Sequence, residues 1–150
     1  MSYNTRPSWL RSGFRRHLLN LGYRRAEARH RTEPEWFLPY VGRLLDDIGQ
    51  IEQPSVQWHV AQMLHQLRGG LSEDQARRST ELLQANLATS SDWIVLNVTM
   101  DILAGWAQHD ADLATWLVPE LARLQNDPRR SVAKRATRRI DEIRGRARGG

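Results

Sequence analysis

The sequence predicts an all-α protein of about seven helices in a single domain. Apolar residues recur every three or four positions over most of the 150 residues, which is the period of an amphipathic helix. Residues that start and stop helices separate these apolar segments at short intervals. No segment shows the strict alternation of a strand over a length that a helical period fails to explain.

Composition limits the class of protein further. Hydrophobic residues make up 40% of the chain and there are six Trp, which argues against global disorder. No apolar run approaches the roughly 18–20 residues of a membrane span, and the N-terminus lacks the apolar core of a secretory signal. We therefore expect no membrane span and a cytoplasmic location. The absence of Cys excludes disulfides and thiolate chemistry.

The first apolar stripe predicts a helix over residues 8–22, and an Arg-rich connection follows over residues 23–31. The stripe consists of Leu10, Phe14, Leu18 and Leu21. We expect residues 1–32 to form a basic N-terminal helix and connection that pack on the rest of the domain.

The second helix has a clear start. Thr32 can cap it, Pro34 suits an early helical position, and Glu35 can complete a capping box. Gly49 is the expected stop. Five later helices have comparable signals. Four have caps, at Ser72 with Gln75, Asp92, Asp110, and Asp127 followed by Pro128, and Pro54 precedes the fifth, which Gly69 and Gly70 end.

The same four-position stripe recurs in three later helices, at offsets of 39 and 37 residues from one to the next. The copies are Val56-Val60-Leu64-Leu67, Val95-Thr99-Leu103-Trp106 and Val132-Ala136-Ile140-Ile143. The helices between them repeat as well, because Trp36-Phe37-Leu38-Pro39 corresponds to Trp116-Leu117-Val118-Pro119. A period of about 40 residues is typical of two-helix repeat units that must stack to bury their stripes.

These stripes, with a proline before the first helix of a unit, resemble the HEAT-repeat family. The resemblance covers residues 33–144 and, more weakly, 8–22, and it implies an α-α superhelix, a HEAT-like solenoid, whose second helices line a concave surface. We expect residues 145–150 to form a disordered basic tail.

Charge is distributed unevenly along the chain. Residues 1–31 contain eight Arg and one Glu, and residues 129–150 contain eight Arg and Lys134 against two acids. Each end therefore carries a charge of +7, which leaves −9 for the middle of a chain whose net charge is +5. Such basic ends can bind anionic partners, cap a solenoid or dock on the acidic middle.

Candidate binding residues come from a helical column that lies beside the stripes. It is polar or aromatic in each copy and becomes basic in the last. The candidates for binding a partner are Trp58, Trp93, Asn97, Asp101, Arg130, Lys134 and Arg138. The candidates for binding an anion are Arg15, Arg16, Arg24, Arg25, Arg135 and Arg139. Packing between repeats and polar capping are the structural alternatives for the two sets.

No catalytic motif occurs in the sequence, and we expect neither a metal nor a cofactor. His59 and His65, for example, lie about 240° apart around a helix and do not converge. We therefore expect a non-enzymatic scaffold that binds a protein partner. A nucleic-acid-binding module that uses the basic terminal helices is the alternative. A third hypothesis is an enzyme resembling the HEAT-like alkylpurine DNA glycosylases, for which Trp93 and Asp101 offer residue types but no motif.

Overall fold

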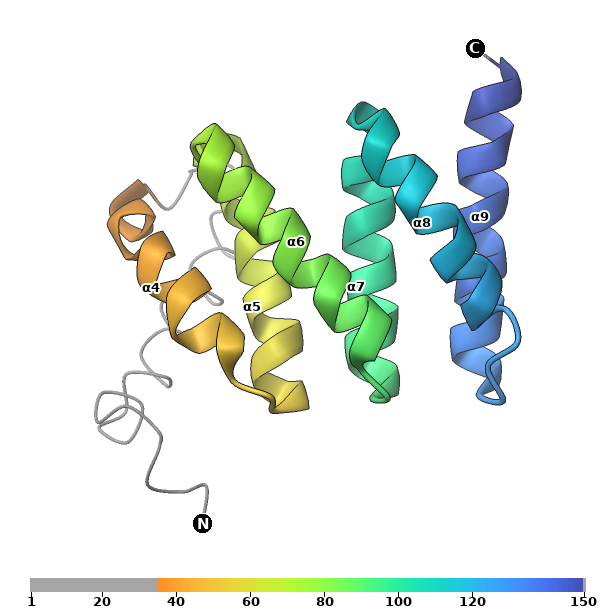
Figure 1. Ribbon diagram of the computed structural model, residues 1–150, viewed down its shortest axis with the longest axis horizontal. Coiled ribbons are helices and arrows are strands. Elements are labelled where there is room, and N and C mark those ends of the chain that lie inside the picture. Colours follow the sequence, from red (N-terminus) through yellow and green to blue (C-terminus); the bar gives the residue numbers. More distant parts are fainter. Residues whose placement is uncertain (1–34, 150) are drawn as a thin grey trace.

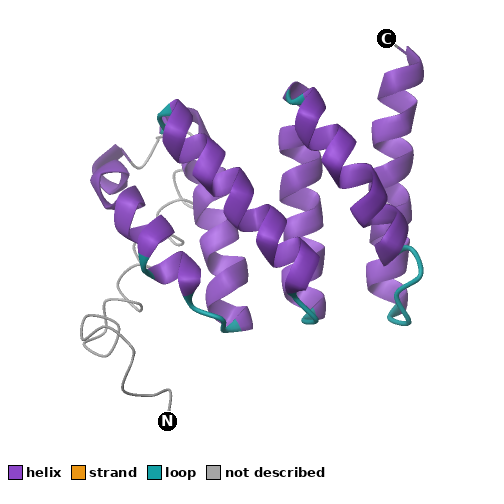
Figure 2. Cartoon of the chain, in the orientation of Figure 1, coloured by secondary structure: helices purple, strands orange, loops and turns teal. Residues whose placement is uncertain are grey.

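The computed structural model describes residues 35–149, and all regular structure in that range is helical (Figure 2). The α-helices are α4 (Val41–Asp46), α5 (Pro54–Leu67), α6 (Glu73–Thr89), α7 (Trp93–Trp106), α8 (Ala111–Leu124) and α9 (Arg130–Gly149). Four short 3-10 helices accompany them: η3 (Glu35–Tyr40), η4 (Ile48–Gln50), η5 (Arg68–Gly70) and η6 (Ala107–His109). The predicted all-α class is confirmed. The helix expected over residues 8–22 lies outside the described residues.

The six α-helices lie in two layers (Figure 1). Helices α5, α7 and α9 run side by side in the same direction, and α4, α6 and α8 cross them on one side. Helix α7 packs against α5 and α9 within its own layer and against α6 and α8 in the other. The central helix therefore contacts most of the other described helices.

The predicted helix starts form as the sequence indicates. Ser72 accepts a hydrogen bond from the backbone N–H of Gln75, whose side chain accepts one from the backbone N–H of Ser72. Asp92 and Asp110 cap α7 and α8 through their carboxylates, which accept backbone N–H groups of the first helical turn. Each of these contacts satisfies donors that a helix N-terminus otherwise leaves unpaired.

The three repeated stripes form the core between the layers. All twelve stripe residues are buried, and the side chain of Leu103 is 0% exposed. Each fully buried aliphatic side chain stabilises the fold by roughly 1.5–3 kcal/mol relative to an exposed one. The apolar periodicity therefore identifies the residues that hold the two layers together.

The structure differs from the prediction at both ends of the described region. The second predicted helix is divided: η3 contains Pro39, and regular α-helix begins only at Val41. Proline lacks an N–H donor and its ring clashes with the carbonyl four residues earlier, which disfavours an α-helix, but the equivalent Pro119 is accommodated within α8. At the other end, α9 continues through Gly149, so the tail expected to be disordered from residue 145 is helical over residues 145–149.

Gly49 lies within η4, where α4 gives way to the connection to α5. A Cβ atom at this position would stand 2.7 Å from Cδ2 of Leu82 and 2.9 Å from the carbonyl oxygen of Leu44. The predicted stop residue thus also permits a close approach between this turn and α6.

Replacing Leu103 with Ala should lower the free energy of unfolding by about 2–5 kcal/mol, because the change leaves a cavity at the centre of the core. Urea unfolding followed by circular dichroism measures this loss. The partly buried Leu82 provides a matched control, and Leu82→Ala should cost clearly less. Equal losses in the two variants would contradict the central position assigned to α7.

Candidate functional site

The three predicted binding residues on α7 differ in their exposure to solvent. Trp93 is 51% exposed, Asn97 is 6% exposed, and Asp101 lies between these extremes. Asn97 therefore does not belong to an exposed binding surface, contrary to the prediction. Its Oδ1 atom has no hydrogen-bond partner among the described residues. Sequence periodicity does not reveal this burial, because the residue lies off the apolar stripe.

Asp101 joins α7 to α9 through two guanidinium groups. Its carboxylate accepts a hydrogen bond from Arg135 and another from Nε of Arg139, the latter at 2.9 Å. Arg139 also pairs with Glu142 on its own helix. Arg135 and Arg139 are therefore already neutralised by partners within the chain, which argues against the anion-binding role predicted for them.

The outer side of α9 carries cations of a different kind. Arg130, Lys134 and Arg138 are exposed, and no hydrogen bond or ion pair joins them to another residue of the described region. Residues four apart on a helix lie about 6 Å apart along its axis and on nearly the same face. These three side chains therefore form one row, which we call the α9 edge.

The remaining predicted site residues are not part of this row. The Trp58 ring is partly buried and stacks on His59, with 3.6 Å between the ring centroids and 27° between the planes. It lies on α5, two helices away from α9 (Figure 1). Four predicted anion-binding residues lie outside the described residues: Arg15, Arg16, Arg24 and Arg25.

Sequence reasoning missed a polar cluster where α5 and α7 end. The guanidinium of Arg68 lies over the Trp106 ring, 3.9 Å from its centroid, and donates hydrogen bonds to the Ala76 carbonyl and the Thr80 hydroxyl of α6. The indole Nε1–H of Trp106 donates to Nδ1 of His65 at 3.1 Å. The cluster connects α5, α6 and α7. The only sign of it in the sequence is the position of Trp106 on the apolar stripe.

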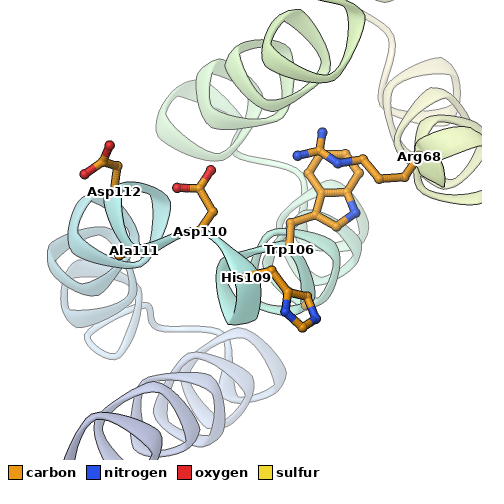
Figure 3. A pocket seen from close by; sticks show the side chains of 7 residues that line it. Arg68, Trp106, His109, Asp110, Ala111 and Asp112 are labelled. Atoms are coloured by element: carbon orange, nitrogen blue, oxygen red, sulfur yellow. The ribbon is translucent and has the colours of Figure 1, made fainter. Parts of the chain in front are cut away.

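An open depression of about 540 Å³ lies beside this cluster (Figure 3). Its lining combines charges of both signs: Arg68, Gly105, Trp106, His109, Asp110, Ala111 and Asp112. Two of these side chains already hold helices in place, because Arg68 binds α6 and Asp110 caps α8. The depression therefore lies where helix ends meet. Its lining residues do not share a chemistry that would bind one class of ligand.

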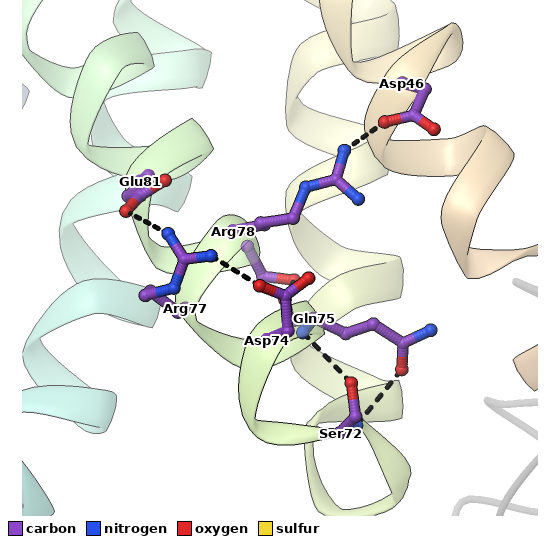
Figure 4. A network of polar contacts seen from close by, with 8 residues as sticks. Asp46, Ser72, Asp74, Gln75, Arg77, Arg78 and Glu81 are labelled. Atoms are coloured by element: carbon purple, nitrogen blue, oxygen red, sulfur yellow. Dashed lines mark hydrogen bonds and ion pairs between the residues drawn. The ribbon is translucent and has the colours of Figure 1, made fainter.

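Two further ion pairs fix the positions of the other elements. Arg78 on α6 pairs with Asp46 on α4 (Figure 4). Before α9, both carboxylate oxygens of Asp127 accept hydrogen bonds from the Arg129 guanidinium, which also reaches the Ser91 carbonyl before α7. Hydrogen bonds from Arg129 lower the pKa of Asp127 to about 2. The loops that precede α7 and α9 are thereby tied to each other.

The geometry defines an all-helical protein of two layers with a basic outer edge on α9. No helix within residues 35–149 is both long and apolar enough to cross a membrane. The same residues contain no group of three or more His, Cys, Asp or Glu side chains placed to hold a metal ion. The chain matches no protein-family model, no curated protein and no solved structure.

The contact between Trp106 and His65 predicts a pH-dependent stability. Burial, with a smaller contribution from the nearby Arg68, lowers the pKa of His65 in the folded state below the ordinary value of 6.5. As pH falls through 6.5 the unfolded chain therefore takes up this proton first, and the free energy of unfolding decreases. Because the ring keeps contact with solvent, we expect a modest effect.

Urea unfolding at pH 7.5 and pH 5.5 measures the effect, and His65→Gln supplies the control that cannot titrate. The wild-type protein should lose more stability between these two pH values than the variant does. Identical losses would show that the proton on His65 does not oppose folding.

Proposed function

We propose that the protein is a non-enzymatic scaffold of HEAT-like repeats that binds a protein partner. The observation that carries this proposal is the α9 edge, where Arg130, Lys134 and Arg138 are exposed without partners in the described part of the chain. Several other cationic side chains pair with acids, as at Asp101, Asp46 and Asp127, whereas Arg144, Arg146 and Arg148 further along α9 are exposed as the α9 edge is. A cationic row that is unpaired within residues 35–149 suits an acidic surface on another molecule.

Repetition of the helix pairs supports the HEAT-like interpretation. Helices α5 and α6 form one antiparallel pair, and α7 and α8 form the next in the same orientation (Figure 1). The stripes on α5, α7 and α9 occupy equivalent buried positions. A stack of such pairs gives an extended surface to which partners bind without any reaction.

The hypothesis of a glycosylase-like enzyme gains no support from the arrangement of its candidate residues. Asp101 is held by Arg135 and Arg139, so its carboxylate is committed to joining two helices. Trp93 lies two helical turns away, at the first residue of α7. We therefore retain binding rather than catalysis as the proposal.

Affinity capture tests the scaffold proposal. The wild-type chain should retain a protein partner from a lysate of its source, and the variant Arg130→Glu/Lys134→Glu/Arg138→Glu should retain about tenfold less, since three attractive contacts become repulsive. The variant Arg144→Glu/Arg146→Glu/Arg148→Glu makes the same change of charge further along the same helix and serves as the control. Recovery of the bait alone under several growth conditions would contradict the proposal.

A nucleic-acid-binding function is the second candidate, and the length of α9 favours it. Beyond the α9 edge the helix carries three more exposed cations, Arg144, Arg146 and Arg148. Guanidinium groups bind phosphate oxygens in a bidentate manner, which suits them to a nucleic-acid backbone.

Salt dependence tests this second function. If α9 binds phosphates, a labelled oligonucleotide should bind at low salt, and its affinity should fall steeply as salt rises because condensed counterions are released. Both triple variants should then weaken binding. Fluorescence anisotropy between about 20 and 200 mM salt measures this. Absence of binding at the lowest salt would exclude the nucleic-acid function.

A further inference from the structure

Helices α5, α7 and α9 share one column of equivalent positions, and on α7 this column reaches the boundary with the next helix of the layer. On α7, Asn97 is buried and Asp101 reaches across to α9. On α5, which packs against α7, Gln62 occupies the position equivalent to Asp101, and its Oε1 atom is buried. On α7 the column therefore includes the side chain that contacts the next helix of the layer.

On α9 the same column is the α9 edge. Lys134 is equivalent to Asn97, and Arg138 is equivalent to Asp101, at an offset of 37 residues. No helix of the described region covers these positions, and all three side chains of the row are exposed. On α7 this position carries Asp101, which contacts α9. On α9 the equivalent position carries Arg138, which is exposed.

We propose that the α9 edge is a docking site for an acidic helix of a protein partner, which lies along α9 as α9 lies along α7. The contact between α7 and α9 shows the form of the pairing, because one carboxylate is held by two guanidiniums four residues apart. In the proposed contact the charges are reversed, so that the guanidinium of Arg138 is held by two carboxylates. These carboxylates lie four residues apart on the partner helix. This inference rests on the proposed scaffold function and names the chemistry of the partner.

The charge pattern on α9 favours a helix over a continuous polyphosphate. Asp141 lies one turn beyond Arg138 and is also exposed, close to the axis of the row. A phosphate backbone that followed the row would meet this carboxylate and be repelled by it. A helix with separately placed carboxylates can instead bring an uncharged residue to that position.

Two synthetic peptides of identical composition test the proposal. Both contain about 18 residues of Ala, Gln and Glu with capped ends; in the first the Glu residues lie at i, i+4 and i+8 on one face, and in the second they are spread around the helix. Titration followed by fluorescence anisotropy should show the first peptide binding about tenfold more tightly than the second. Equal affinities would mean that the edge responds to net charge alone, which would overturn the proposal.

A second experiment reverses the charge of the α9 edge. Arg130→Glu/Lys134→Glu/Arg138→Glu should lose the acidic peptide and bind instead its counterpart with Lys at i, i+4 and i+8. Because this variant gains an activity, the result does not depend on an assumption that it folds. The variant Arg144→Glu/Arg146→Glu/Arg148→Glu should keep the acidic peptide within about twofold. Equal loss in both variants, or displacement of the peptide by an oligonucleotide of equal charge, would overturn the proposal.

The scaffold function and the docking site for an acidic helix are tested separately. If affinity capture returns a partner and neither peptide binds, the scaffold function stands and the acidic-helix inference is wrong. If the peptide binds the α9 edge as described and no protein is captured, the docking site stands and the scaffold proposal is contradicted.

Discussion

Burial of the α7 stripe between α5 and α9 and beneath α6 and α8 is the constraint on which the other features depend. A single amphipathic helix of 14 residues has little stability in water, so each helix must cover the apolar face of its neighbour. Side chains such as Leu103 provide that cover, and they fix the distance between the two layers. The polar contacts can select an arrangement only because this core already holds the helices close together.

Polar contacts then determine how adjacent helices are set against each other. Asp101 engages Arg135 and Arg139 on the solvent side of the boundary between α7 and α9, and Arg68 covers Trp106 where α5 ends. Ion pairs that stay partly exposed contribute little energy, on the order of 0–1 kcal/mol each. Their consequence is specificity of position, since an apolar stripe alone tolerates rotation of one helix against the next.

The same contacts divide the Arg residues of the C-terminal region into two groups. Arg129, Arg135 and Arg139 are bound to acids of the chain, whereas the α9 edge, like Arg144, Arg146 and Arg148 beyond it, has no such partner in the described region. A helical repeat that ends in a polar face stays soluble, and a row of one sign additionally selects for partners of the opposite sign. Solubility and recognition therefore make compatible demands on this edge.

The sequence by itself determined the helical class, the repeated stripes and the capping contacts of Ser72, Asp92 and Asp110, because these depend on local geometry and on the 3.6-residue period. It did not determine which off-stripe residues are accessible. Asn97 and Lys134 occupy equivalent positions, yet one is buried and the other exposed, because α7 packs between α5 and α9 whereas α9 lies at the end of the described layer. Only tertiary structure decides this, since the difference arises from the neighbour that each helix meets.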